Sequence, residues 1–355
     1  MASAAKMLPA HPELSDVSRR RWDELLGNVA GLLPAGPASV LIDGDQAWAG
    51  TVAGRLAASL NAADRPCFLL SGSGHGAAAD SDGGDPRIPS SAIMLAEGGR
   101  WRQARNWDAV IWLRTLPGAG HPCRVDGEAG ADIVIDLDDP SWPVIRRVAA
   151  PLAGRGRWYI TETRAFFATR AATWDTKFGD DLPAYAAAIA QASLPPGAVV
   201  LDVGCGTGRS LPALRDAVGP HGRVLAVDLT PEMLTQASGR ASAADATLIL
   251  ADARRLPLAD GSADAIFAAG LIMHLPDPGA GLRQLARVTR PAGQLILFHP
   301  SGRAALAARH GRTLKPGEPL DAAPLRRLTS DNGWQLTTYD DAVHRFLAIA
   351  VRRAM

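Results

Sequence analysis

Short apolar runs alternate with longer amphipathic stretches along the second half of the chain. The runs occupy residues 199–203, 223–227, 247–250, 264–268 and 294–299. Apolar runs of this length, bounded by turn residues, are typical of buried strands. Because helical patterns separate them, this half of the chain is expected to form a parallel α/β sheet.

The pattern changes after the last of these runs. Residues 301–321 are rich in glycine, proline and arginine and are expected to form an insertion. A helical pattern then covers residues 322–332, and alternating patterns at 335–339 and 345–351 predict two further strands. These last strands are expected to pair as a hairpin at one edge of the sheet.

The first half of the chain has a similar alternation with shorter runs. A helical pattern at residues 17–33 ends before Pro34, and a second, rich in alanine and leucine, ends near Leu60. The predicted strands are residues 39–42, 67–70, 109–113 and 133–135. We therefore expect two α/β domains, covering residues 1–152 and 153–355, since glycine and proline interrupt the pattern between them.

A glycine-rich loop follows the first strand of the second half. Gly204, Gly206 and Gly208 allow a tight turn with positive φ and a close approach of a ligand to the backbone. A dinucleotide site would have the spacing G-x-G-x-x-G, but Arg209 stands at the third-glycine position. Asp202 directs a carboxylate into the turn, where it would repel a pyrophosphate. A cationic ligand without phosphate fits better, and S-adenosylmethionine has an ammonium and a sulfonium group.

Acidic residues end the next two strands. Asp228 can accept hydrogen bonds from both ribose hydroxyls, and Leu229 can lie on the adenine. Asp252 and Ala253 follow the third strand, where the carboxylate can bond the adenine amino group. Asp228 could instead be a helix N-cap, but Thr230 already fills that position. Asp252 could also be only a loop carboxylate.

Four motifs in order carry a family resemblance over residues 156–355. The matching segments are residues 201–208, 227–228, 252–253, 256–257, 264, 274–276 and 290–293. In these segments the chain resembles a class I S-adenosylmethionine-dependent methyltransferase of the ubiquinone/menaquinone type. The resemblance implies a Rossmann-like sheet and a cofactor site built from Asp202, Gly204, Cys205, Gly206, Gly208, Asp228, Leu229, Asp252, Ala253 and Gly270.

Two histidines are candidates for a general base in such an enzyme. His274 lies after the fourth strand and His299 after the fifth, both at the carboxyl edge of the sheet, where ligands bind. His274 is the first choice and His299 the main competitor. An exposed loop histidine without a catalytic role is an equally good reading of His274. An acceptor with a carbon or sulfur nucleophile needs neither.

The aromatic residues at 157–178 precede the first strand of the methyltransferase-like half. In the family such a segment usually folds over the cofactor as a lid. The alternative is that these rings pack between the domains. The insertion at 301–321 is expected to help shape the acceptor pocket.

The first half loosely resembles uridine-kinase-like P-loop proteins over residues 15–150. A P-loop has the pattern G-x-x-x-x-G-K-[ST], whose lysine neutralises the phosphates. With Gly44 as the first glycine, Ala49 stands at the second, Gly50 at the lysine and Thr51 at the hydroxyl. We expect a degenerate P-loop domain without phosphotransfer, which serves as a scaffold, in dimerisation or in the acceptor site. Residues 71–85 are expected to be a flexible loop.

Composition limits the remaining functions. The 355 residues are 47% hydrophobic and 21% charged, with a formal net charge of +1, as in a soluble globular protein. Arg19, Arg20 and Arg21 are expected on a solvated helix face, so a nucleic-acid partner is disfavoured. The three scattered cysteines have no metal-site spacing and favour a reducing compartment. No apolar run reaches membrane-spanning length, so we expect a cytoplasmic protein with no membrane partner.

The sequence thus predicts methyl transfer from S-adenosylmethionine to a small molecule, of the kind found in secondary metabolism. Two alternatives stay open: a regulatory protein that binds the cofactor without chemistry, and a small-molecule or nucleoside kinase with an accessory methyltransferase domain. No metal is expected, and a homodimer is left open.

Overall fold

The structure is a computed structural model that describes residues 15–70, 92–102, 106–115, 128, 130–154, 157–178, 181–309, 313–314 and 316–354. The chain divides into two compact units, Met1–Trp158 and Tyr159–Met355. The boundary expected from the sequence lies a few residues earlier, at 152/153. The expected loop at 71–85 and Cys123 lie outside the described residues.

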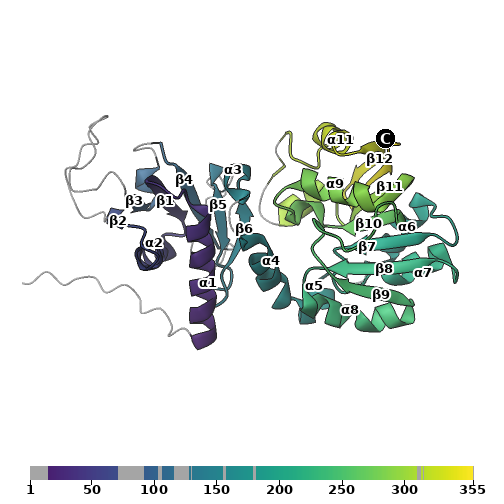
Figure 1. Ribbon diagram of the computed structural model, residues 1–355, viewed down its shortest axis with the longest axis horizontal. Coiled ribbons are helices and arrows are strands. Elements are labelled where there is room, and N and C mark those ends of the chain that lie inside the picture. The colour runs from purple at the N-terminus through teal and green to yellow at the C-terminus, as the bar shows by residue number, and fades with distance from the viewer. Residues whose placement is uncertain are drawn as a thin grey trace, which may run out of the picture. The chain divides into compact units, whose positions relative to one another are not determined.

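The first unit is a mostly parallel α/β sheet (Figure 1). Its strands run in the order β2-β3-β1-β4-β5-β6, and only β6 is antiparallel to its neighbour. Its elements are α1 (Asp16–Leu32), β1 (Ala38–Gly44), α2 (Gln46–Ala62), β2 (Cys67–Leu70), β3 (Ile93–Glu97), η1 (Gly99–Trp101), β4 (Ala109–Arg114), β5 (Ile133–Asp136), β6 (Val144–Val148) and α3 (Ala150–Ala153).

Two strands of this sheet were not predicted. β3 lies between β1 and β2, so the second predicted strand does not pair with the first. β6 forms an edge, and Arg146 and Arg147 interrupt its apolar pattern. Both misses have the same cause, because short strands in mixed surroundings give little periodic signal.

The junction between β1 and α2 differs from the sequence-based alignment. β1 ends at Gly44, and Asp45 caps a helix that begins at Gln46, with its side chain accepting the Ala47 N–H at 2.9 Å. Thr51 is therefore well inside α2, not at the end of a phosphate loop. A cradle of backbone amides needs a loop at this junction, and the chain has none there.

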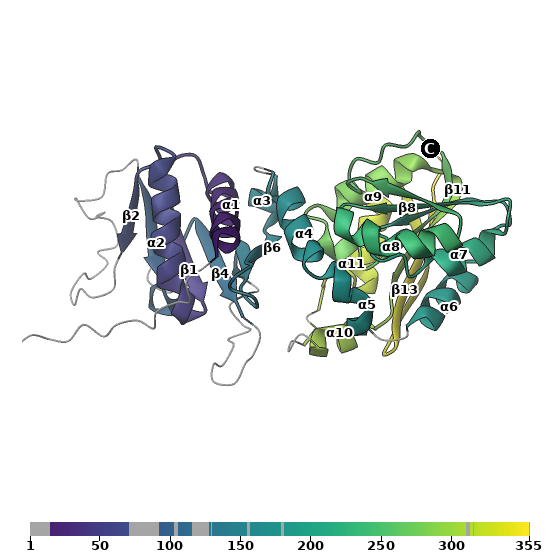
Figure 2. The ribbon, with the colours of Figure 1, turned by 90° about the horizontal axis from the view of Figure 1, so that it is seen from below.

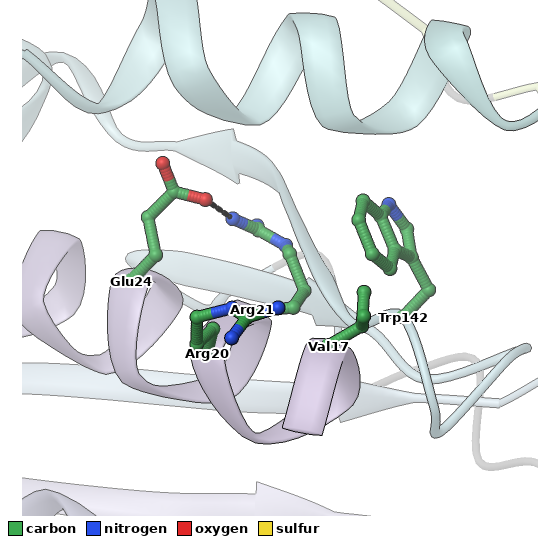
Figure 3. A pocket seen from close by; sticks show the side chains of 5 residues that line it. All are labelled: Val17, Arg20, Arg21, Glu24 and Trp142. Atoms are coloured by element: carbon green, nitrogen blue, oxygen red, sulfur yellow. Dashed lines mark hydrogen bonds and ion pairs between the residues drawn. The ribbon is translucent and has the colours of Figure 1, made fainter. Parts of the chain in front are cut away.

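Arg21 also departs from expectation, because its side chain is buried whereas Arg19 and Arg20 are exposed. Its Nε donates to the Pro143 carbonyl at 2.8 Å, and its Nη1 lies 2.6 Å from Glu24. Figure 3 shows this pair and Trp142 lining one pocket. The pocket is shallow and has a volume of about 340 Å³. Only two of the three arginines thus lie on a solvated helix face.

The second unit is a seven-stranded sheet in the order β12-β13-β11-β10-β7-β8-β9, with β13 antiparallel to both neighbours (Figures 1 and 2). Its strands are β7 (Val199–Val203), β8 (Arg223–Asp228), β9 (Ala246–Leu250), β10 (Ala263–Ala269), β11 (Thr289–His299), β12 (Trp334–Ala342) and β13 (Arg345–Arg352). Its helices are α4 (Trp158–Ala168, whose first residue belongs to the first unit), η3 (Ala171–Thr173), α5 (Trp174–Phe178), α6 (Leu182–Ala192), α7 (Leu211–Val218), α8 (Pro231–Ala243), η4 (Ile272–His274), α9 (Pro278–Val288), α10 (Arg303–Arg309) and α11 (Ala322–Asp331).

This arrangement confirms the α/β fold and the strand predictions of the second half. β7 is an inner strand, and its Val200 side chain packs with residues of α6, α7 and β10 in one buried cluster. Tyr185 joins this core by packing against Phe298, with ring centroids 4.9 Å apart. The insertion after β11 contains one helix, α10, among its described residues. In the same described part of the chain, no helix is both long and apolar enough to cross a bilayer.

Candidate active site

The glycine loop after β7 has the conformation that its composition predicts. Gly204, Gly206 and Gly208 have φ angles of +76°, +53° and +78°. The Gly204 N–H donates to the Val227 carbonyl of β8 at 2.8 Å, which ties the loop to the neighbouring strand. A Cβ added to Gly206 would meet no heavy atom within 4 Å. The loop therefore leaves open space beside its backbone.

Asp202 is buried in the central strand below this loop. It pairs in register with Ala226 of β8 and Phe267 of β10, and its side chain is 1% exposed. The Ser210 hydroxyl donates to its carboxylate. Burial, and then the nearby Asp228 charge, raise the pKa of Asp202 to about 7. A cation arriving at the loop would favour the ionised form of this carboxyl.

Asp228 ends β8 beside the loop. One carboxylate oxygen accepts the Gly206 N–H at 2.9 Å and the other accepts the Thr230 N–H at 2.8 Å. Asp228 thus fixes the loop and accepts a hydrogen bond at the start of α8, while its ribose-binding role stays a prediction. Burial raises its pKa in spite of these bonds. Each of the two carboxylate oxygens thus already accepts one backbone N–H.

Asp252 lies at the same edge of the sheet, two residues past the end of β9. Its carboxylate accepts hydrogen bonds from the Arg254 side chain, with Nε at 3.1 Å from both oxygens and Nη2 at 2.7 Å from one. The Arg254 guanidinium also lies 4.0 Å from the centre of the Tyr159 ring. Burial, and then the Asp252 charge, raise the pKa of Tyr159 to about 12. No pattern in the sequence indicated this pairing.

His299 ends β11 next to the loop after β10. A Cβ on Gly270 would lie 4.0 Å from the His299 ring. Nδ1 lies 2.9 Å from the Ser301 carbonyl oxygen and 3.0 Å from the Ser301 nitrogen, so either tautomer has a partner there. When Nδ1–H donates to the carbonyl, the lone pair is on Nε2. Burial lowers the pKa of His299, which keeps the ring neutral and able to accept a proton.

His274 ends the short η4 turn after β10 and contacts the aromatic segment. Its ring lies edge-on to Phe167 of α4, with centroids 5.2 Å apart. Phe167 also packs against Phe166 and Trp174 at 5.0 and 5.6 Å. The segment expected to be a lid therefore lies against the loop that follows the fourth strand of this unit.

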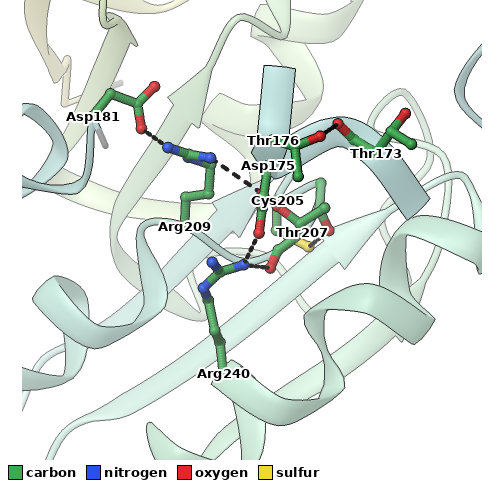
Figure 4. Close-up of polar contacts among 9 residues, drawn as sticks. Thr173, Asp175, Thr176, Asp181, Cys205, Thr207, Arg209 and Arg240 are labelled. Atoms are coloured by element: carbon green, nitrogen blue, oxygen red, sulfur yellow. Dashed lines mark hydrogen bonds and ion pairs between the residues drawn. The ribbon is translucent and has the colours of Figure 1, made fainter. Parts of the chain in front are cut away.

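Polar contacts also join the aromatic segment to the glycine loop (Figure 4). Asp175 of α5 accepts hydrogen bonds from the Thr207 hydroxyl at 2.6 Å and from Arg240 at 2.7 Å. Arg209 lies 3.2 Å from the same carboxylate and also pairs with Asp181. Sequence analysis missed Asp175, Asp181 and Arg240. Arg209 was a sequence signal for these contacts, because it is a charged residue at the position where a dinucleotide-binding loop has its third glycine.

The remaining predicted site residues lie around the same edge. The Cys205 side chain is buried in the hydrophobic core, so only its backbone can face a ligand. Ala253 is buried, and Leu229 is half-buried with its carbonyl accepting Arg164 Nε at 2.9 Å. Across the described ranges of the chain, no cluster of three or more histidine, cysteine or acidic residues could hold a metal ion.

Comparison with known proteins agrees with this geometry. A family described as "Methyltransferase domain" matches residues 201–297. Demethylmenaquinone methyltransferase of Bacillus licheniformis is 34% identical over 110 residues, which are 31% of this chain and 47% of that protein. A 27-O-demethylrifamycin SV methyltransferase of Amycolatopsis mediterranei is 37% identical over 102 residues, 28% of this chain and 37% of that protein.

Two further matches are a relative described as uncharacterised and a solved structure of low sequence identity. An uncharacterised 37.1 kDa protein in transposon TN4556 of Streptomyces fradiae is 41% identical over 30% of this chain and 31% of its own length. The chain spans less than half the length of each of these three curated relatives. A structure titled as a SAM-dependent methyltransferase from Aquifex aeolicus is 23% identical and covers 52% of this chain and 98% of that one, with a TM-score of 0.41.

The matched segment contains the glycine loop, Asp228, Asp252 and His274, and it ends two residues before His299. Residues 201–297 are therefore similar to a methyltransferase domain.

Proposed function

We propose that the protein transfers a methyl group from S-adenosylmethionine to a small-molecule acceptor. The observation that carries this proposal is the alignment of Asp202, Asp228 and Asp252 at the carboxyl edge of three adjacent strands, around an open glycine loop. Ligands of open α/β sheets bind at this edge. Three acids there suit a cationic ligand rich in hydroxyl and amino donors.

Several residues suit polar groups of the cofactor. Asp202 is the acid beneath the loop for the ammonium end, and Asp228 lies beside the loop for the ribose hydroxyls. Asp252, whose two oxygens Arg254 already bonds, is the candidate partner of the adenine amino group. Backbone groups of Gly204, Gly206 and the neighbouring residues can line the methionine part. When bound, S-adenosylmethionine supplies an electrophilic methyl group.

The protein's share of catalysis is orientation together with proton removal. Holding the acceptor nucleophile in line with the methyl group in a dry pocket accounts for most of the expected acceleration. For a hydroxyl or amine nucleophile, a general base adds about 10²- to 10⁴-fold. We place His299 ahead of His274 in this role, because Ser301 anchors its Nδ1 and burial keeps its ring neutral. His274, in contact with Phe167, would then form part of the acceptor wall.

The acceptor is proposed to be a small molecule, of the type modified in secondary metabolism. The aromatic rings of Phe166, Phe167 and Trp174 next to His274 suit an apolar or planar acceptor. Location in the cytoplasm and the absence of nucleic-acid and membrane partners stay predictions, as does a homodimer. The two alternatives, a regulatory cofactor-binding protein and a kinase, are tested by product formation.

For the first unit we propose a structural role derived from a degenerate P-loop fold. Charged side chains at the carboxyl edge of its sheet pair with one another: Asp43 with Arg102 at 2.9 Å and Arg114 with Asp136 at 2.6 Å. The Arg102 guanidinium also lies 5.0 Å from the centre of the Trp112 ring. Arginines held in this way are not available to neutralise phosphates.

The cofactor site is tested at Asp228. Asp228→Ala should weaken S-adenosylmethionine binding by about 1.5–3 kcal/mol, the usual size of a charge-assisted hydrogen bond, which is roughly 10- to 150-fold in Kd. Asp264→Ala is the matched control, because Asp264 binds the Val199 N–H and Arg290 instead of the loop. Calorimetry measures both Kd values. Labelled cofactor incubated with metabolite extract and analysed by mass spectrometry identifies the product, and an unchanged Kd in Asp228→Ala contradicts the proposed site.

A further inference from the structure

The short helix α5 has too few residues to be stable by itself, so its contacts decide whether it stays on the glycine loop. Trp174 packs against Phe167, and the polar contacts of α5 with the glycine loop converge on Asp175. It is bonded to the Thr207 side chain within the loop, and to Arg240 of α8. Arg240 Nη1 also donates to the Thr207 carbonyl at 3.0 Å. One carboxylate therefore holds α5, the loop and α8 together.

The attachment of α5 to the loop can be released because Arg209 has a second carboxylate partner, Asp181. The Arg209 side chain is 6% exposed and is shared by two carboxylates, Asp181 at 15% exposure and Asp175 at 37%. A buried cation that loses its only partner is strongly destabilised. When Asp175 leaves, Arg209 keeps Asp181, so no uncompensated charge results. The Asp175–Arg240 pair is partly exposed, which weakens it.

We propose that Asp175 is a releasable clasp that closes α5 over the glycine loop and sets the rate of cofactor exchange. This inference rests on the proposed function and deepens it by assigning a positioning residue. A clasp that lies over the loop must open both for entry and for exit of the cofactor. Its removal should speed both steps and leave the equilibrium affinity nearly unchanged.

The test compares the native 355-residue chain with Asp175→Ala and Asp175→Asn. Stopped-flow fluorescence gives the association rate of S-adenosylhomocysteine, and displacement of the radiolabelled compound by excess unlabelled compound gives its dissociation rate. Both rates should rise about three- to tenfold in Asp175→Ala, while Kd stays within twofold. Asp245→Asn, whose side chain is 98% exposed, is the control for loss of one charge and should leave both rates unchanged.

Amide hydrogen exchange supplies a readout without cofactor. Residues 174–176 should exchange faster in Asp175→Ala, whereas β7 should not. Asp181→Asn should instead lower the melting temperature, because it removes the permanent partner of a buried guanidinium. This contrast separates a clasp from a general structural role.

Three outcomes would overturn the inference in distinguishable ways. Unchanged rates in Asp175→Ala with normal binding by the native protein would show that α5 does not limit exchange. A rise in dissociation rate alone would make Asp175 a contributor to affinity. If the native protein binds no S-adenosylhomocysteine, the proposed function itself fails and the clasp with it.

Discussion

Phe167 on α4 lies edge-on to His274 of η4, with ring centroids 5.2 Å apart and an angle of 81° between the planes. This contact joins the aromatic segment to the loop after β10 at a point separate from the Asp175 clasp. An edge-to-face pair contributes about 0.5–1.5 kcal/mol beyond the area it buries. It is strong enough to position the His274 ring and weak enough to adapt to an acceptor.

Phe167→Leu should therefore affect the acceptor more than the cofactor. We expect kcat/KM for the acceptor to fall roughly 2- to 10-fold, the rate equivalent of that pair, while the cofactor Kd stays within twofold. Trp48→Leu is the control for loss of an aromatic pair, because its ring stacks on Trp22 in the first unit. An equal loss of cofactor affinity would place Phe167 in the cofactor site instead.

The lowered pKa of His299 leads to a prediction for how kcat/KM changes at acid pH. Its pKa is lowered by burial below the ordinary value of about 6.5, and a base must be neutral to act. The value of kcat/KM should be flat between about pH 7 and 8 and should fall as the pH drops through the lowered pKa. His299→Gln should lower kcat at least tenfold, about 1.4 kcal/mol, and remove this acid limb.

The comparison variant for that measurement is His274→Gln. If His274→Gln loses the acid limb and His299→Gln keeps it, the base belongs to the loop after β10. If neither substitution changes turnover, the acceptor nucleophile needs no base, as expected for carbon or sulfur.

Because the pKa of Asp202 is raised, we expect cofactor binding to release a proton from its carboxyl group. Its pKa of about 7 in the free protein means that the carboxyl is partly protonated at neutral pH. An ammonium group favours the ionised form, so affinity should rise as the pH increases toward this pKa and level off above it. Calorimetry in buffers with different ionisation enthalpies measures the released proton. Asp202→Asn should abolish the release, and proton uptake on binding would contradict the assignment.

The first unit should neither hydrolyse ATP nor transfer its phosphate. Lysine is absent from the expected position, and α2 begins directly after Asp45. A coupled assay with Mg²⁺ and ATP should show no turnover above background. Phosphoryl transfer that is lost in Thr51→Ala would restore the kinase alternative.

Sequence alone was sufficient for the sheet of the second unit, whereas the roles of the predicted site residues stay predictions. The strands around Asp202 and Asp228 are nearly continuous apolar runs, and the glycines between them have a strong conformational reason to be there. The edge strand β6 was missed because arginines interrupt its pattern. β3 was missed because a short strand carries little periodicity of its own.

The polar network around the loop could not be predicted in the same way. Asp175 meets Thr207 and Arg240, which are 32 and 65 positions away in the chain. Such contacts depend on how helices pack over the sheet and leave no local pattern. The pairing of Asp252 with Arg254 is local, but nothing in the sequence distinguishes it from a solvated loop.

The direct junction between β1 and α2 has a consequence for engineering. Gly50 occupies the position of the missing lysine, yet a Cβ there would lie 2.6 Å from Glu97 Oε2. Gly50→Lys would therefore direct its ammonium toward a carboxylate within the domain, with no phosphate loop in front of it. Because α2 begins at Gln46, most of the residues aligned with a phosphate loop are helical, and adding a lysine alone would not create a phosphate cradle.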